Sequence, residues 1–523
     1  MHDGKPQVFL RRGPRGRANL HAATCDRSTL VYHCLMSMRQ TAAERAHGGM
    51  PFKTLLALII AGEFASALSG SMLYNALGKL FAIYGDPVHV GWLFTSFALA
   101  SAGSAVLISR LGDLYGRARM FKLMLLTLLI GSTISALATD LDVIIVGRAI
   151  QGLAVAILPL GFGLLREHVH DSRDLNLGVG LLGGTYSLST GIGFIISGFV
   201  IDNLGWQHIF TVGAIAAALA LVLTVWLLPE SAQSARTGKI DFVGALVVIP
   251  IVALLLTFNI AKAHGWSDPR TVGLIVFAMA VLAAWAVYEL RHPDPLVDLR
   301  LLANPTIAMV NGAIFFMSMG PVTYTQVVMP LIQQPVWTGV GFGISATIAG
   351  LVKLPTNLTS GLAAFAAGLL ARRYSMRPAV ILATVANFLA FVTLTLYHGS
   401  LVFVLAVCIL LISPAATIMF ACAPGMIMQS APPERTSEVT GLSSVMRALA
   451  QAIGAQMISV TLASSAATNA TGTSYPDAHA YMMTFAFLAA VSLLSMAIAQ
   501  FIPRQPMLEV RTSDASAAAH EHA

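Results

Sequence analysis

Charged side chains are scarce in this sequence. Of its 523 residues only 11% are Asp, Glu, Lys or Arg, whereas 56% are hydrophobic, and the mean hydropathy is +0.75. Soluble globular domains carry roughly a quarter charged residues, so this composition excludes that class. The sequence therefore predicts a protein that crosses a membrane several times.

Chemical motifs are also missing. The sequence has no GxxxxGK[ST] phosphate-binding loop, which argues against ATP as an energy source. It has no recognisable set of nucleophile, base and metal ligands, so we expect no enzyme, no metal and no cofactor. Cys408 and Cys422 lie in one predicted helix, about 21 Å apart at a rise of about 1.5 Å per residue, too far for a disulfide.

Long apolar runs predict fourteen transmembrane helices and hence an all-α polytopic membrane protein. Residues 464–480, before the last run, are polar and rich in Gly, Thr and Ala, so we expect a mobile loop there. The runs are 54–76, 90–110, 121–139, 143–166, 176–201, 208–229, 242–261, 271–290, 306–331, 341–370, 378–398, 401–429, 439–466 and 481–502.

Basic residues alternate from one predicted connection to the next. Between Arg110 and Arg511, the connections on one side and the carboxyl-terminal tail hold 16 Lys and Arg residues, whereas the opposite connections hold three. Positive loops stay in the cytoplasm, so we expect both termini on the cytoplasmic side of the cell (inner) membrane. This orientation accounts for the net charge of +7 without a nucleic-acid partner.

The ends and the middle of the chain differ from the rest in composition. Residues 1–53 are basic and contain scattered Pro and Gly, which predicts a disordered tail, and residues 503–523 predict a second, cytoplasmic one. A weak internal repeat, in which Gly180 and Gly193 recur as Gly441 and Gly454, favours duplication of a six-helix unit. The predicted halves are residues 54–230 and 306–502, and residues 231–305 are cytoplasmic linker segments with two inserted helices.

The connection after the second run combines charge with glycine. It reads Ser109-Arg-Leu-Gly-Asp-Leu-Tyr-Gly-Arg-Ala-Arg-Met120. Asp113 can accept hydrogen bonds from the next helix and pair with Arg117 or Arg119, while Gly112 and Gly116 allow a tight turn. We expect a conformational latch here. The alternative is that the cations only set the orientation of the chain.

This loop resembles the signature small-x-Leu-x-Asp-x-x-Gly-Arg-x-Arg of the major facilitator superfamily. Arg148-Ala-Ile-Gln-Gly152 resembles the second motif of that superfamily. Gly205-Trp-x-x-Ile-Phe210, Asp294-Pro-Leu-Val-Asp298 and the fourteen runs narrow the resemblance to the fourteen-span drug:proton antiporters, over residues 54–502. The resemblance implies two six-helix bundles, two extra helices and proton-coupled efflux of drugs.

The fifth run departs from that family. Its motif usually reads Gly-Pro-x-x-Gly-Gly, whereas this chain has Gly193-Phe-Ile-Ile-Ser-Gly198, with Phe194 at the proline position. We therefore expect no proline kink there. Gly180, Gly193 and Gly198 are expected to allow close packing between helices.

Ionisable residues inside predicted membrane helices are functional candidates, because each costs about 2.5 to 3.5 kcal/mol at a helix centre. Glu63 could load a proton or hold a cationic substrate, or it could be a carboxylate permanently paired with a neighbouring helix. Arg148 could tune a nearby acid, with Glu63 as the candidate partner, or it could anchor to backbone carbonyls. Both are proton-coupling candidates.

Cavity candidates lie in the second half. Lys353 could face a wet cavity and select against cationic substrates, or extend along its helix. Arg447 could line the cavity or anchor a helix. Asn311, Tyr324 and Gln326 are expected to face the cavity.

We therefore predict a secondary active transporter, monomeric in the lipid bilayer, that exports amphipathic drugs or related small molecules in exchange for protons. One alternative is an exporter of a specific endogenous lipid or siderophore-like product. Another is a non-transporting membrane receptor or accessory subunit.

Overall fold

A computed structural model describes residues 50–169, 171–229, 243–292, 295, 298–373, 376–430, 436–470 and 472–503. The predicted tails at residues 1–53 and 503–523 therefore lie almost wholly outside the described residues, as does much of the linker around residues 230–242. The account below concerns the compact unit that begins at Phe52.

Helices make up almost all of this unit. From the amino-terminal side they are α2 (Phe52–Met72), η1 (Leu73–Ala76), α3 (Leu77–Tyr84), α4 (Pro87–Tyr115), α5 (Arg117–Leu137), α6 (Leu141–Leu153), η2 (Ala154–Ala156), α7 (Ile157–His168), α8 (Ser172–Asn203) and α9 (His208–Leu227). These helices are called the first group below.

A short intermediate set and then a second group follow. The intermediate elements are η3 (Gly244–Val247), α10 (Val248–His264), α11 (Pro269–Arg291) and η4 (Leu299–Ala303). The second group consists of α12 (Pro305–Met319), η5 (Pro321–Thr323), α13 (Thr325–Gln333), η6 (Val336–Thr338), α14 (Ala346–Val352), α15 (Leu354–Arg373), α16 (Met376–Leu396), α17 (Leu401–Val407), the π-helical η7 (Cys408–Ile412), α18 (Ser413–Ser430), α19 (Thr436–Leu462) and α20 (Ala478–Gln500).

Several helices begin at an aspartate that caps them. The carboxylate of Asp86 accepts a hydrogen bond from the Val88 N–H and precedes Pro87, the first residue of α4. Asp140 caps α6 and Asp268 caps α11 in the same way. A side-chain acceptor at this position satisfies an N–H that the helix itself leaves unpaired.

Helices cover most of the described residues of each predicted run, and eleven of the described segments are long and apolar enough to cross a membrane. Several segments are interrupted. The first is α-helical except at η1, and α17 and α18 are joined through the π-helical η7. A run of apolar residues does not reveal such local changes in hydrogen bonding.

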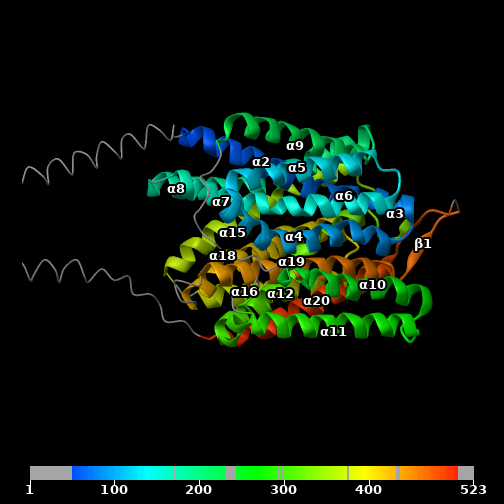
Figure 1. Ribbon diagram of the computed structural model, residues 1–523. Helices are drawn as coiled ribbons and strands as arrows, with labels where there is room; N and C mark the ends of the chain where they lie inside the picture. The colour runs from blue at the N-terminus through cyan, green and yellow to red at the C-terminus, as the bar shows by residue number, and fades with distance from the viewer. Residues whose placement is uncertain are drawn as a thin grey trace, which may run out of the picture. The chain divides into compact units, whose positions relative to one another are not determined.

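The two groups pack mainly within themselves (Figure 1). In the first group α2 packs on α8 and α9, and α6 packs on α4 and α5. In the second, α12 packs on α19 and α20, α16 on α18 and α20, and α15 on α18. The groups meet where α4 lies along α19 and where α8 meets α14, and α10 and α11 pair with each other.

The predicted loop at residues 464–480 contains two short strands. β1 (Ala466–Thr468) and β2 (Ser474–Pro476) pair antiparallel, with Ala467 opposite Tyr475. The Tyr475 ring also meets the Trp337 ring edge-on, with centroids 5.8 Å apart. Figure 1 shows this hairpin extending beyond the helices at the end where α3 lies.

Candidate functional site

Asn75 joins four elements at one end of the helices. Its Nδ2 donates to the Phe194 carbonyl at 3.1 Å, the Ala346 carbonyl at 3.0 Å and the Ser197 hydroxyl at 3.2 Å. Its Oδ1 accepts from Gln333 Nε2 at 2.6 Å, and the side chain is fully buried. One amide thus ties η1 to α8, α13 and α14.

Further polar contacts cross between the groups at this end. Asp202 Oδ1 accepts from the Ala346 N–H at 3.2 Å and Oδ2 from the Thr347 N–H at 2.8 Å. Thr95 Oγ1 donates to Gln456 Oε1 at 3.0 Å between α4 and α19. We call this end, defined by Asn75 and Asp202, the closed end.

Glycine permits the closest approach there. A Cβ at Gly198 of α8 would lie 2.5 Å from the Ala346 carbonyl of α14. A Cβ at Gly350 of α14 would meet the Phe194 carbonyl just as closely. Any larger side chain would force the two helices apart.

At the opposite end, α8 and α15 have no such contacts among the described residues. Leu181 of α8 is 44% exposed, and Leu362 and Phe365 of α15 are each 70% exposed. A Cβ at Gly180 or at Gly361 would have nothing within 4 Å. We call this the open end. Among the described residues, the two groups are thus in contact at one end, whereas α8 and α15 stand apart at the other.

Gly180 does not show the close helix packing that was expected of it. Gly193 and Gly198 do lie in tight helix contacts, since a Cβ at Gly193 would lie 3.3 Å from the Leu68 carbonyl of α2. Gly180 packs against no other described helix in this conformation, because α8 stands apart from α15 at the open end.

The loop after α4 also lies at the open end. Gly116 has a φ of 98° and forms the turn between α4 and α5. Asp113 Oδ1 accepts from Arg117 Nε at 2.9 Å and Nη2 at 2.7 Å, while Arg117 Nη1 donates to the Gly163 carbonyl at 2.8 Å. Arg117 therefore ties the loop to α7, and Arg119 is exposed.

Glu63 is buried in the middle of α2. Its side chain is 3% exposed, and among the described residues no hydrogen bond or ion pair engages its carboxylate. A buried carboxylate without a fixed partner can bind and release a proton.

Arg148 binds backbone carbonyls instead of Glu63. Its guanidinium donates to the Leu93 carbonyl at 3.2 Å and to Gln151 Oε1 at 2.7 Å, and lies 4.4 Å from the centroid of the Phe97 ring. In the described part of the chain it forms no ion pair with Glu63. The predicted partnership of the two residues is therefore absent from this conformation.

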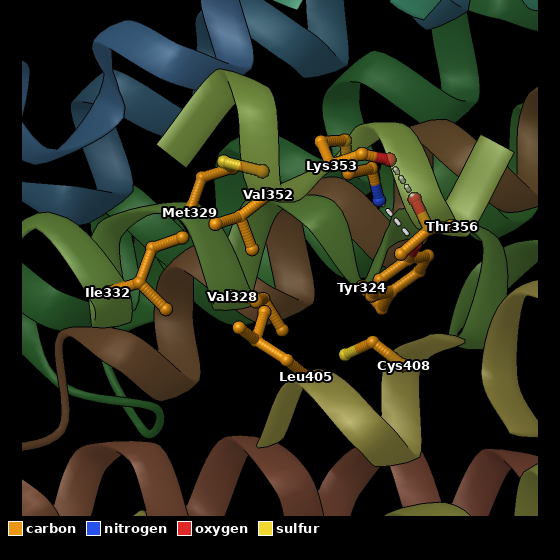
Figure 2. A pocket seen from close by; sticks show the side chains of 9 residues that line it. All are labelled: Tyr324, Val328, Met329, Ile332, Val352, Lys353, Thr356, Leu405 and Cys408. Atoms are coloured by element: carbon orange, nitrogen blue, oxygen red, sulfur yellow. Dashed lines mark hydrogen bonds between the residues drawn. The ribbon is translucent and has the colours of Figure 1, made fainter. Parts of the chain in front are cut away.

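Lys353 and Tyr324 lie next to each other in the wall of a small pocket (Figure 2). The ammonium donates to the Tyr324 hydroxyl and, at 3.0 Å, to Thr325 Oγ1. Tyr324 Oη lies 2.7 Å from Ser413 Oγ. The side chains that line the pocket are Tyr324, Val328, Met329, Ile332, Val352, Lys353, Thr356, Leu405 and Cys408.

Aromatic rings continue from this pocket into the first group. The Lys353 amine lies 5.9 Å from the Phe194 ring centroid. The Tyr74 ring lies 6.5 Å from Phe194 and 4.6 Å from Phe94. Tyr74 and Phe94 were not predicted from the sequence. Phe194 stood out there only because it replaces the proline of the related motif.

The remaining cavity candidates fall in different places. Asn311 is buried and donates to the Ile307 carbonyl of its own helix at 2.8 Å. Gln326 donates to the Ala455 carbonyl of α19 at 3.0 Å. In this conformation both amides thus bind backbone carbonyls, and the expectation that they face a cavity stays a prediction. Arg447 is exposed, with its guanidinium 5.6 Å from the Phe420 ring centroid.

Comparison with known proteins agrees with this architecture. A family model described as Major Facilitator Superfamily matches residues 59–455. Multidrug resistance protein 3 of Bacillus subtilis (strain 168) is 25% identical over 340 residues, which cover 64% of this chain and 65% of that protein. Puromycin resistance protein pur8 of Streptomyces alboniger is 27% identical over 334 residues, which cover 60% of this chain and 66% of that protein.

The chain thus spans just under two thirds of the length of these two relatives. Among solved structures, the fold is similar to that of a mutant form of the nucleoside transporter NupG. The TM-score is 0.59 at 14% identity, with 86% of this chain and 100% of that chain covered. A sequence identity this low supports a similarity of fold and nothing further.

Long apolar helices around a buried polar centre define a multi-pass helical membrane protein. The chain belongs to the major facilitator superfamily. Members of this superfamily are transporters and not enzymes, so the resemblance to the superfamily and the prediction of a non-enzyme are both confirmed, whereas the fourteen-span antiporter family stays a prediction.

Proposed function

We propose that this protein exports amphipathic drugs or related small molecules across the cell membrane in exchange for protons. The observation that carries the proposal is the contrast between the closed end, held by Asn75 and Asp202, and the open end at Gly180. A molecule that is shut at one end and separated at the other is one of the two states that an alternating-access transporter needs. The named drug-resistance relatives support drugs as the cargo.

The moving parts in this proposal are the first and second groups, as two six-helix bundles within fourteen spans. They would rock about the contacts of α4 with α19 and of α8 with α14, which join the two groups. In the orientation set by the basic loops, both termini and the open end face the cytoplasm. The protein would work as a monomer, and α10 and α11 would be a pair inserted between the bundles.

Glu63 is the proposed proton carrier. Its burial without a fixed partner among the described residues supports this role, because protonation removes the cost of a charge inside the membrane. Arg148 is held by carbonyls and by Gln151, so it acts on Glu63 only from a distance. A proton that enters across about 100 mV supplies about 2.3 kcal/mol, enough to drive export against a modest gradient.

The proposed latch is the Asp113–Arg117 pair. Arg117 joins this carboxylate to the Gly163 carbonyl of α7, so the loop holds α4, α5 and α7 together while the open end is separated. Closing this end requires new contacts to the loop from the second group, and the energy of the pair would then differ between the two states. Arg119 and Gly116 complete the loop.

Neither alternative from the sequence analysis is favoured by the relatives, whose names describe drug and antibiotic resistance. The proposal is tested by adding substrate to the full-length protein in proteoliposomes and measuring proton release. We expect release with the wild type and its loss in Glu63→Gln. Glu167→Gln, at the end of α7, is the matched control and should behave as the wild type. Unchanged coupling in Glu63→Gln would remove Glu63 from the mechanism.

A further inference from the structure

Lys353 is a cation buried without an acid. Its side chain is 8% exposed, and within the described residues no carboxylate lies within ion-pair distance of its ammonium. A charge at this depth is costly unless something compensates it. The hydroxyls of Tyr324 and Thr325 are neutral acceptors, so they satisfy hydrogen bonds without balancing the charge.

The groups around the ammonium can donate further hydrogen bonds. The Tyr324 hydroxyl accepts from Lys353 and shares a second hydrogen bond with the Ser413 hydroxyl, in which either group can be the donor. Thr325 also accepts from the lysine, which leaves its O–H to donate elsewhere. An ammonium carries three N–H donors, and only two are engaged by these hydroxyls. The ammonium and the Thr325 hydroxyl beside it can therefore each donate a further hydrogen bond, and the ammonium adds a positive charge.

Aromatic rings border the same point. The ammonium lies 4.0 Å from the centroid of the Tyr324 ring and 5.9 Å from that of Phe194. Apolar side chains such as Val328 and Leu405 complete the lining, and in Figure 2 Lys353 points toward Tyr324. Such a mixture suits a molecule with one charged group on an apolar or aromatic body.

Cations also outnumber acids among the ionisable candidates of the described helices. Glu63 is the acid of that set, whereas Arg148 and Lys353 are buried cations and Arg447 is an exposed one. Carbonyls and the Gln151 side chain already bind Arg148. Lys353 is the charged side chain in the lining of the pocket, and its positive charge attracts anions and disfavours cationic amphipaths.

We infer that Lys353 binds a carboxylate on the transported molecule, with the Thr325 hydroxyl as a second donor and the Tyr324 and Phe194 rings against its apolar part. The inference rests on the proposed export function and adds the substrate class, which is acidic amphipaths. The lysine would then act as a substrate-selecting residue in the second group, while the proton site at Glu63 lies in the first.

Binding of two matched dyes to the full-length protein in detergent tests this inference. Dansyl-phenylalanine carries a carboxylate, and dansyl-phenylalaninamide is the same molecule with a neutral amide in its place. We expect the wild type to bind the carboxylate at least tenfold more tightly, measured by dansyl fluorescence. In Lys353→Met the preference should fall to about one, with affinity for the amide unchanged, so that amide binding also shows the variant to be folded.

Two further variants complete the design. Thr325→Val keeps the lysine and should reduce the preference several-fold. Lys79→Met, which removes a lysine that binds the Ile201 carbonyl at the closed end, is the matched control and should keep it. Equal wild-type affinities, no binding of either dye, or a preference that survives Lys353→Met would each overturn the inference.

The same dyes separate this inference from the proposed function. The binding experiment needs no gradient and no transport. Carboxylate-selective binding in a protein that fails to export either dye from vesicles would contradict the export function and leave the anion site in place. Gradient-driven export of both dyes at equal rates, without a binding preference, would support the export function and contradict the anion site.

Discussion

Asp202 of α8 binds Thr347 of α14 through one carboxylate oxygen. Its Oδ2 accepts from both the Thr347 N–H at 2.8 Å and the Thr347 Oγ1–H at 2.7 Å, across 145 residues of sequence. The first turn of α14 thus receives a side-chain acceptor from the other group of helices, in addition to its own cap Ser345. A contact of this kind stabilises the closed end only while the two groups are together.

The Asp202→Asn variant is expected to shift the protein toward the state that is open at this end. Hydrogen bonds to a charged group contribute roughly 1.5 to 3 kcal/mol, so their loss should change the ratio of the two states by about tenfold or more. Spin labels on Leu204 and Ile348, both exposed beside the contact, would report a larger share of long distances. Asn203→Ala changes the neighbouring side chain, which bonds within α8, and should leave the distribution as it is.

The Gly180→Leu variant is expected to slow transport at least tenfold while leaving substrate binding intact. A Cβ at this position has nothing within 4 Å in the present state, so the bulky side chain fits here. Closing the open end brings α8 and α15 together, and the leucine would then prevent contact. Gly273→Leu, at an equally uncrowded position on α11, is the control. Equal turnover in the two variants would argue against closure at Gly180.

Replacing Phe194 by proline is expected to destabilise the protein, although the related motif has proline there. α8 runs unbroken from Ser172 to Asn203, and a proline inside it removes a backbone hydrogen bond at a cost of about 3 kcal/mol or more. The substitution also removes the ring beside Lys353. Thermal unfolding in detergent should show a lower midpoint for Phe194→Pro than for Phe194→Leu. A midpoint equal to that of the wild type would show that α8 tolerates the kink.

The stability of the first turn of α20 is expected to depend on pH, because the Asp477 carboxylate caps this helix. Burial acts to raise the pKa of this carboxyl, but hydrogen bonds from the Ser465 hydroxyl and the Ala480 N–H outweigh it and hold the pKa below its ordinary value of 3.8. The carboxylate therefore stabilises the helix start above pH 3.8, and this stability is lost as the pH falls through the lower folded value.

Hydrogen exchange of the Ala480 amide measures this effect. Its protection, corrected for the intrinsic rate, should fall as the pH drops below about 4, and should be low at every pH in Asp477→Asn. Asp268→Asn, which removes the cap of α11, should leave Ala480 unaffected. Constant protection of the wild type down to about pH 2 would show that the carboxylate does not hold this helix start.

The positions of the helices could be predicted because a membrane leaves the backbone few choices. Polar backbone groups must be satisfied within the segment, so the apolar run at 90–110 had to become a helix, here Pro87–Tyr115. The predicted pairing within the Asp113 loop also needed only local spacing, since Arg117 follows by four residues.

Contacts between distant helices could not be predicted in this way. Tyr324 and Lys353 were separate candidates, but their contact depends on how the chain before α13 packs against the junction of α14 and α15. Asn75 drew no attention as a single amide near the end of an apolar run, yet it joins four elements. The hydrogen bonds of Asn311 and Gln326 to backbone carbonyls were not predicted for the same reason, because polarity alone does not tell a cavity from a buried helix contact.

Gradient-driven uptake by the purified protein tests the central claim most directly. Proteoliposomes with an acidic interior, supplied with an amphipathic dye outside, should accumulate the dye well above protein-free liposomes, and collapse of the pH gradient by an ionophore should abolish the difference. Accumulation no greater than in protein-free liposomes, or accumulation that persists after the gradient is collapsed, would contradict proton-coupled export.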